Sequence, residues 1–286
     1  MRVDFAREKR WWIDKAADEE QDLGDEQTNR ALRWREIERR LGGVQSILEV
    51  GGSTGVFSIP LAQRGFAVTH LDFSPTALDI ARQRAEGLQT IEFVDGNAAD
   101  LPFGDRSFDL VLNMDGAISF CGSEAERAVR EACRVARGTV ILTVSHRASL
   151  ARGWVDVSVK CLGRLCPAVY EMLGSGFWHR DQFPENRVLA KGCPQDYVGT
   201  IKAFLPEELG AIVGDCGMEV VRLGGLGSLA HLCYGETLAR VMGDSRLFEE
   251  FVSLAERYDL EVSPQGPGSY RRAGLIAVGE RPQSCQ

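Results

Sequence analysis

The chain has 286 residues, 44% of them hydrophobic and 26% charged, which is the composition of a globular protein and excludes long disorder or a membrane-embedded chain. Its formal net charge of -8 argues against nucleic acid as a partner, because that binding draws on clustered Lys and Arg. No apolar run approaches the roughly 20 residues that span a bilayer, and the charged N-terminus lacks the apolar centre of a signal peptide, so we expect a cytoplasmic protein that binds a small molecule and no membrane.

Residues 1–43 are predicted to form a helical cap ahead of the main domain. Apolar residues recur at helical spacing in two patterns within residues 3–41, and the acidic, glycine-broken link "DEEQDLGDEQ" separates them. Gly42 and Gly43 follow the second pattern, as glycines commonly do where a helix ends. The first helix carries "RWW", and we expect it to close over the ligand site of the domain that follows.

The ligand-binding core is predicted over residues 44–146. Apolar, β-rich runs alternate there with amphipathic runs, which indicates a parallel sheet covered by helices on both faces. The fold class is therefore a doubly wound, Rossmann-like α/β fold. Strands are expected near 45–50, 66–71, 90–94, 108–114 and 138–145, with helices near 54–64, 75–86 and 123–136.

The alternation lapses after the fifth expected strand. Residues 147–204 show no clear period and carry Gly, Pro, Cys, Trp and Tyr, so we expect a lid or substrate-binding insertion there. Over residues 205–286 the core resumes, with "LPEELGAIVGDCG" as a helix that ends at Gly217 and one or two inserted helices near 236–258. "MEVVRLGGL" and "AGLIAVGER" are the last two strands of a mostly parallel sheet of seven strands.

The stretch "ILEVGGSTGVFSIPLAQRG" predicts a strand, a tight turn and a helix. Gly51, Gly52 and Gly55 let a ligand approach the backbone, and the N-terminus of the helix favours a carboxylate or phosphate. A dinucleotide fingerprint would need glycines where Ser53 and Val56 stand, and the lysine of a P-loop is absent. Both of these phosphate-binding interpretations are therefore disfavoured.

Two acidic residues flank this turn in the expected sheet. Glu49 precedes Gly51 by two positions, and Asp72 directly follows the second strand. A ligand with a cationic amine and a ribose suits the pair, with Glu49 near the ammonium and Asp72 accepting from both hydroxyls. S-adenosylmethionine has an ammonium, a sulfonium, a ribose and a carboxylate for the N-terminus of the helix. An alternative for Asp72 is to cap the following helix, but Ser74 already fits that role.

Four stretches carry a family resemblance: "LEVGGSTG", "HLDFSP", "DGNAADLPFGDRSFDLVLNMDG" and "CRVARGTVILTVSHR". In order and spacing they resemble the successive motifs of class I S-adenosylmethionine-dependent methyltransferases, over roughly residues 44–146. The resemblance implies an enzyme that moves a methyl group to a small organic acceptor and leaves S-adenosylhomocysteine. Ser53 departs from the usual middle glycine, and Asn97 stands where Asp is usual but still offers a carbonyl oxygen as an acceptor.

The resemblance also implies roles for individual residues. Gly51, Gly52 and Gly55 would line the methionine end together with Glu49, and Asp72 would hold the ribose. The remaining cofactor-binding candidates are Phe73 beside the adenine, Asn97 and Ala98 at its amino group, and Met114, with Asp115, under the sulfonium and methyl group.

Methyl transfer needs a general base only when the acceptor holds its proton at neutral pH. Much of the remaining catalysis is alignment and exclusion of water. Asp115 and His146 follow the fourth and fifth strands and should face the crevice at the carboxyl ends of the strands, while His179 lies in the insertion. These three are the catalytic candidates, although a packed or exposed structural histidine is an equal alternative for His146 and for His179.

Other activities stay open at this point. The same pocket would serve an enzyme that eliminates or cyclises the aminobutyryl arm of S-adenosylmethionine, or a non-catalytic binding protein. The eight cysteines show no CxxC pair and are expected to be mostly reduced thiols without a metal, although Cys161, Cys166 and Cys193 gather in the insertion and leave a soft-metal or metalloid site as an alternative. The sequence does not indicate the oligomeric state.

Overall fold

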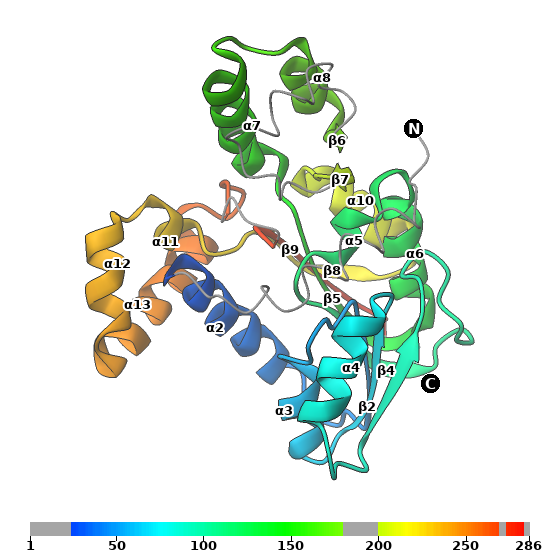
Figure 1. Ribbon diagram of the computed structural model, residues 1–286. Helices are drawn as coiled ribbons and strands as arrows, with labels where there is room; N and C mark the ends of the chain where they lie inside the picture. The colour runs from blue at the N-terminus through cyan, green and yellow to red at the C-terminus, as the bar shows by residue number, and fades with distance from the viewer. Residues whose placement is uncertain (1–23, 180–199, 269–272, 283–286) are drawn as a thin grey trace.

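The fold is known from a computed structural model that describes residues 24–179, 200–268 and 273–282. One seven-stranded sheet, in the order β3-β2-β1-β4-β5-β9-β8, forms its centre (Figure 1). β9 alone runs in the direction opposite to the other six strands, so the predicted mostly parallel, Rossmann-like sheet is confirmed. The strands are β1 (Ser46–Val50), β2 (Ala67–Asp72), β3 (Ile91–Asp95), β4 (Phe108–Asn113), β5 (Ala136–Val144), β8 (Glu219–Gly225) and β9 (Leu275–Glu280).

Helices cover both faces of this sheet, as expected for a doubly wound fold. Each face has its own apolar core, because strands that are buried on both sides are apolar along their whole length. On one face the core is closed by α5 (Ala117–Phe120), α6 (Ala125–Val135) and α10 (Pro206–Asp215), and on the other by α2 (Gly24–Glu38), α3 (Ser58–Gln63) and α13 (Ser245–Arg257) (Figure 1).

The remaining helices of the core follow local sequence signals. Ser74 caps α4 (Pro75–Arg84), its hydroxyl accepting from the Ala77 N–H at 3.4 Å, and Pro75 occupies the first turn, where no N–H is needed. After β8 come α11 (Ser228–Leu232), α12 (Gly235–Met242) and α13. Of these, α12 and α13 occupy the region near 236–258 in which one or two helices were expected.

The insertion after β5 contains more regular structure than its sequence indicated. Its described part consists of α7 (Arg147–Leu162), α8 (Pro167–Ser175) and the antiparallel pair β6 (Phe177–His179) and β7 (Thr200–Lys202). These elements stand above the edge of the sheet in Figure 1. The two helices escaped prediction because Gly153 and the Gly163–Pro167 stretch interrupt the apolar spacing.

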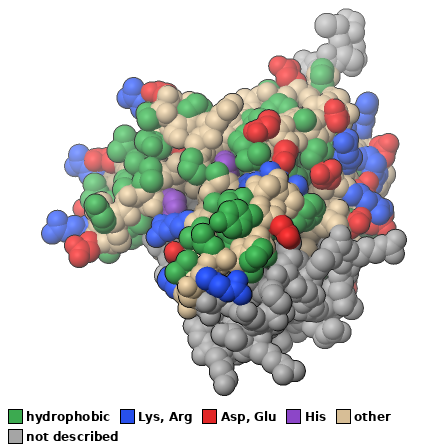
Figure 2. All heavy atoms as spheres, turned by 90° about the horizontal axis from the view of Figure 1, so that it is seen from above, with side chains coloured by type: hydrophobic (Ala, Val, Ile, Leu, Met, Phe, Trp, Pro, Cys, Tyr) green, Lys and Arg blue, Asp and Glu red, His purple; other side chains and the backbone are tan. Residues whose placement is uncertain are grey.

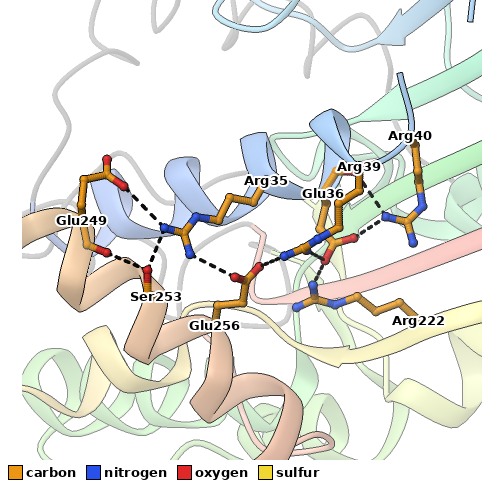
Figure 3. A network of polar contacts seen from close by, with 8 residues as sticks. All are labelled: Arg35, Glu36, Arg39, Arg40, Arg222, Glu249, Ser253 and Glu256. Carbon is orange, nitrogen blue, oxygen red and sulfur yellow. Dashed lines mark hydrogen bonds and ion pairs between the residues drawn. The ribbon is translucent and has the colours of Figure 1, made fainter. Parts of the chain in front are cut away.

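The N-terminal cap is described only from α2 onward, so the first predicted helix and its "RWW" lie outside the described residues. A polar network fixes α2 to α13 and β8 (Figure 3). Glu36, only 2% exposed, accepts from Arg39 at 2.8 Å, from Arg40 at 2.6 Å and from Arg222 of β8. Arg35 and Arg39 both reach Glu256 of α13, at 3.0 and 2.5 Å. No described helix is long and apolar enough to cross a bilayer.

Candidate functional site

The glycine turn after β1 is shaped by the protein's own packing. Gly51 and Gly55 have φ values of +70° and +88°, which side chains disfavour. A Cβ on Gly51 would overlap the Ala117 side chain, and one on Gly52 would overlap the His70 ring. Gly51 and Gly52 therefore bring the turn against α5 and β2, whereas Gly55 lies against Ile59 of α3. The helix α3 begins only at Ser58, later than predicted.

Ser53, the residue that departs from the family's usual glycine, also takes a left-handed backbone conformation, with φ of +48°. Such a conformation costs a non-glycine residue about 1 kcal/mol or more. Two contacts hold it there: the Ser53 N–H donates to Asp72 Oδ2 at 2.9 Å, and the Ser53 carbonyl accepts from His70 Nε2 at 3.1 Å. The backbone N–H and the carbonyl of Ser53 thus both bond to side chains of β2 and fix the turn to that strand.

Asp72 ends β2 and is almost fully buried. Its Oδ2 accepts from the Ser53 N–H at 2.9 Å, and its Oδ1 accepts from the Ser74 N–H at 2.8 Å. Ser74, not Asp72, accepts from the Ala77 N–H of the next helix, so the capping alternative for Asp72 is excluded. Each carboxylate oxygen keeps further acceptor capacity, which suits a diol.

Glu49 lies one residue before the end of β1 and is 2% exposed. Burial raises the pKa of its carboxyl to about 8; the negative charges of Asp115 and Asp72 act in the same direction, and the hydrogen bond from the Ser58 N–H opposes them. The Ser58 N–H donates to Glu49 Oε2 at 2.8 Å. Three carboxyl groups from the ends of β1, β2 and β4 therefore share one region of the site.

Among the described residues, the basic side chain nearest to Glu49 is that of His70, whose Nδ1 lies 3.9 Å from Glu49 Oε2. Because His70 Nε2 donates to a backbone carbonyl, Nδ1 is the acceptor, and the Ser58 hydroxyl donates to it at 2.6 Å. Burial lowers the pKa of His70 to about 4, so the ring is neutral at pH 7. Among the described residues no Lys or Arg forms an ion pair with Glu49.

Arg33 is a member of this site that sequence reasoning missed. It is fully buried on α2, pairs with Asp115 and with Glu26, and donates to the Met114 carbonyl. Its guanidinium also lies 5.4 Å from the centre of the Phe57 ring. Burial alone would lower the pKa of Arg33, but Asp115 and Glu26 outweigh it and the pKa is raised. A permanent cation thus neutralises Asp115 and leaves Glu49 without one.

Two polar contacts join the turn after β4 to neighbouring strands. Asn113 Nδ2 donates to the Val50 carbonyl at 2.8 Å, and the Thr143 hydroxyl donates to the Met114 carbonyl at 2.6 Å. The Met114 side chain is buried in the apolar core on the α2 face. What Met114 presents to its polar neighbours is therefore its backbone carbonyl.

The residues expected at the adenine follow two neighbouring strands, β2 and β3. Asn97 Oδ1 accepts from the Ala99 N–H at 2.9 Å, so part of its acceptor capacity shapes its own turn, and Ala98 is buried. Phe73 is partly buried and packs against the apolar cluster of the insertion. This contact joins the end of β2 to the insertion after β5.

The apolar cluster of the insertion is built largely from aromatic and aliphatic side chains of α7, α8 and the β6–β7 pair. Trp154 and Trp178 stack at 6.4 Å with 9° between their planes. Seen from above, other hydrophobic side chains lie on the surface around it (Figure 2), and Tyr170 is 65% exposed.

The two candidate histidines lie on different elements, His146 at the start of α7 and His179 at the end of β6. His146 caps α7: its Nδ1 accepts from the Ala148 N–H at 3.1 Å. In the neutral ring Nε2 therefore carries the proton, and it is buried without a hydrogen-bond partner among the described residues. Burial lowers the pKa of His146 to about 4. His179 ends β6, where its backbone pairs with Thr200.

The described residues hold no cluster of three or more His, Cys, Asp or Glu with metal-binding geometry. Of the three cysteines proposed as a soft-metal alternative, Cys166 is a buried free thiol. Cys193 lies outside the described residues, and the Cys161 side chain is likewise outside them.

Comparison with known proteins agrees with this geometry. Residues 47–138 match the model of a methyltransferase domain. A phosphatidylethanolamine N-methyltransferase of Cereibacter sphaeroides is 37% identical over 148 residues, which are 50% of this chain and 67% of that protein. A demethylmenaquinone methyltransferase of Tropheryma whipplei (strain Twist) is 42% identical over 82 residues, 28% of this chain and 34% of that one.

A solved structure shows the same fold. A putative methyltransferase of Haloferax volcanii, in complex with the Trm112 activator, superposes with a TM-score of 0.53 at 13% identity, over 98% of this chain and 99% of that one. The chain spans between about a third and a little over half of the length of the first curated relatives that it matches.

A doubly wound sheet with a glycine turn after β1 and an acid at the end of β2 defines a nucleoside-binding α/β protein. The matches narrow this class: the chain belongs to the class I S-adenosylmethionine-dependent methyltransferases. S-adenosylmethionine is the cofactor of that family, and the buried, uncompensated Glu49 and the doubly anchored Asp72 fit its ammonium and its ribose.

Proposed function

We propose that the protein transfers the methyl group of S-adenosylmethionine to a small organic acceptor and leaves S-adenosylhomocysteine. The observation that carries this proposal is the buried Glu49 carboxyl, which has a raised pKa and no cationic partner among the described residues. A ligand that brings an ammonium and a sulfonium relieves that electrostatic cost. Arg33 already neutralises Asp115, so the cation is needed at Glu49.

The same residues divide the cofactor between them in this proposal. Glu49 binds the ammonium, and Asp72 accepts from the ribose hydroxyls while its backbone contacts keep its orientation fixed. Gly51, Gly52 and Gly55 line the methionine end, Phe73, Asn97 and Ala98 surround the adenine, and Met114 lies near the sulfonium.

The cofactor supplies a methyl group activated by the sulfonium, so the chain's contribution is to align the acceptor and exclude water. Arg33 fixes Asp115 next to the methyl position. For an acceptor that holds its proton, His179, His146 or Asp115 is the proposed base. The neutral His146 offers an N–H at Nε2, so it would first act as a hydrogen-bond donor and serve as a base only in its other tautomer.

The acceptor is proposed to lie under the insertion of residues 147–204, which acts as a lid. The contact between Phe73 and the cluster around Trp154 and Trp178 supports this, because it brings apolar insertion side chains to the end of β2. Demethylmenaquinone and phosphatidylethanolamine, the acceptors named for two relatives, are small organic molecules. We propose that the enzyme is cytoplasmic. Because its net charge is -8, we also propose that it has no nucleic-acid substrate.

The reaction is tested by incubating the protein with S-adenosylmethionine and a metabolite extract and identifying the products by mass spectrometry. We expect S-adenosylhomocysteine together with an extract component that has gained one methyl group. Methylthioadenosine without a methylated product would replace the proposal by cyclisation or elimination of the aminobutyryl arm. Binding without either product would indicate a non-catalytic protein.

The cofactor assignment is tested at Asp72. We expect Asp72→Ala to weaken S-adenosylmethionine binding at least tenfold in calorimetry, about 1.4 kcal/mol. Asp109→Ala is the matched control, because Asp109 Oδ2 also accepts two backbone N–H groups, from Gln45 at 3.1 Å and Ser46 at 3.0 Å. Asp109 lies near the start of β4, at the other end of the sheet from Asp72. Equal affinity in the Asp72 and Asp109 variants would refute the ribose assignment.

A further inference from the structure

Cys133 and Cys216 form a pair of thiols remote from the cofactor site. Cys133 lies near the end of α6, just before β5, and Cys216 follows α10, just before β8. Because both cysteines closely precede a strand, the pair lies at the end of the sheet where β5 and β8 start, which is opposite to the end that carries the glycine turn. Cys133 belongs to the apolar core that α6 and α10 cover, Cys216 packs against that core, and each thiol shifts the pKa of the other.

One guanidinium holds the two backbones side by side. Arg281 Nη1 donates to the Cys216 carbonyl and Nη2 to the Cys133 carbonyl, both at 2.8 Å. Arg281 Nε also donates to the Ala136 carbonyl, at 3.3 Å. One guanidinium that binds both carbonyls keeps the end of α6 and the end of α10 close together, as a disulfide between the two cysteines would require.

The two thiols differ in access and in acidity. Cys133 is buried, and its contact with Cys216 and its burial both raise its pKa. Cys216 is half-buried, and the contact with Cys133, helped by Arg130 and Arg281, lowers its pKa to about 7 against the effect of burial. The thiolate therefore resides on the more accessible sulfur, which is the arrangement of an attacking and a resolving cysteine.

We propose that Cys133 and Cys216 are a redox modification site, at which a low-molecular-weight disulfide such as glutathione disulfide oxidises the two thiols to an intramolecular disulfide. The Cys216 thiolate attacks one sulfur of the reagent, forms a mixed disulfide and expels one glutathione thiolate. Cys133 then gives up its proton to that thiolate, attacks Cys216 Sγ and expels the second glutathione thiolate. Two electrons pass from the cysteines to the reagent, which leaves as two glutathione molecules.

The disulfide would tie α6 to α10 and close the chain from residue 134 to 215, including the whole insertion. Closing a loop of this length constrains the unfolded chain, and for a protein of this size we expect the thermal midpoint to rise by about 5–10 °C. Glutathione would reverse the change.

The test uses the full chain, incubated with glutathione disulfide and digested without reductant. We expect peptide mapping by mass spectrometry to find Cys133 linked to Cys216, and the intact mass to fall by two hydrogen atoms. A wild-type protein that stops with glutathione attached to Cys216, or that links another pair of cysteines, would overturn the proposal.

Three variants separate the two roles. Cys133→Ser should stop at the mixed disulfide and carry one glutathionyl group on Cys216, and Cys216→Ser should form no link to Cys133. Cys121→Ser is the control, because Cys121 is buried in the same core and burial raises its pKa to about 12, so its loss should leave the link intact. A Cys133→Ser protein without the glutathionyl group on Cys216 would contradict the assigned order of attack.

Discussion

Two buried glutamates, Glu36 on α2 and Glu49 near the end of β1, have opposite surroundings. Glu36 and Glu49 are each 2% exposed. Glu36 accepts from the guanidiniums of Arg39, Arg40 and Arg222 (Figure 3), whereas Glu49 has a neutral histidine as its nearest ionisable partner and neighbouring carboxylates beyond it.

The difference separates a buried carboxylate that the protein neutralises with its own cations from one that it does not. A buried carboxylate must be paired, or its pKa rises until it binds a proton. The protein meets this requirement at Glu36 with its own arginines, whereas at Glu49 it leaves the requirement to a proton or a bound cation. Burial alone therefore does not distinguish the two roles, and the charges of the neighbours do.

The largest effect is expected from Glu36→Ala. Removing the carboxylate leaves the largely buried Arg222 guanidinium without its ion-pair partner, which typically costs about 3–5 kcal/mol. Arg39 keeps its contact with Glu256. Urea unfolding followed by circular dichroism measures this loss in the free energy of unfolding. A loss below about 1 kcal/mol would remove the structural half of the comparison.

A smaller effect of opposite sign is expected from Glu49→Gln. The folded-state pKa of Glu49 lies above its unfolded value, so the folded protein holds a proton that the unfolded chain releases, and stability falls as pH rises from about 4.5 to about 8. Glutamine removes that decline. The variant should be more stable than wild type by on the order of 3 kcal/mol at pH 7, with the difference vanishing towards pH 4.5.

The control for this pH profile is Glu38→Gln, since Glu38 is exposed on α2. Urea unfolding at pH 5, 6, 7 and 8 should give parallel curves for this variant and wild type. A Glu49→Gln curve that also runs parallel to wild type would mean that Glu49 is ionised in the free protein.

Cofactor binding should expel the proton of Glu49. At pH 6.5 an α-amino group is already charged, so an ammonium that pairs with Glu49 ionises the carboxyl, and up to about one proton is released. Calorimetry in buffers of different ionisation enthalpy counts that proton. Glu49→Gln should release none, and equal release from both proteins would separate Glu49 from the ammonium.

The smallest effect belongs to the exposed end of the Glu36 network. Glu249 is 71% exposed and lies 3.4 Å from Arg35. Solvent screens such a pair, so Glu249→Gln should change the free energy of unfolding by less than about 1 kcal/mol. Urea unfolding beside Glu36→Ala checks this, and a loss as large as that of Glu36→Ala would mean that the network acts as one unit.

The central sheet was predictable because its strands carry their own signal. Apolar and β-branched residues predominate in these strands, although β2 also carries polar residues and β3 is only partly buried. The strands β1, β2, β3, β4 and β5 were each predicted to within two residues at either end. The start of α3 was predicted too early, because Ser53 and Gly55 adopt left-handed conformations that keep residues 54–57 out of the helix. Turn geometry of this kind depends on neighbours such as His70 and Asp72, which local periodicity does not report.

The positions of Glu49 and Asp72 were likewise predictable, since both stand at strand ends and the carboxyl ends of parallel strands meet at one end of the sheet. Arg33 was not, because it comes from a helix that no motif marks. One signal was present: Arg33 shares a helix face with Asn29 and Ile37, at spacings of four residues, and Ile37 belongs to the apolar stripe. A basic residue on such a stripe predicts a buried partner.

Arg33 lies outside the stretch that matches the methyltransferase domain, which begins at residue 47. The recognisable domain is therefore electrostatically incomplete: without α2, Asp115 would lose the buried Arg33 cation that pairs with it. A protein that begins at residue 44 would retain every family motif and lack that cation. The net charge of the region that holds Glu49, Asp72 and Asp115 is thus set in part by a helix outside the recognisable domain.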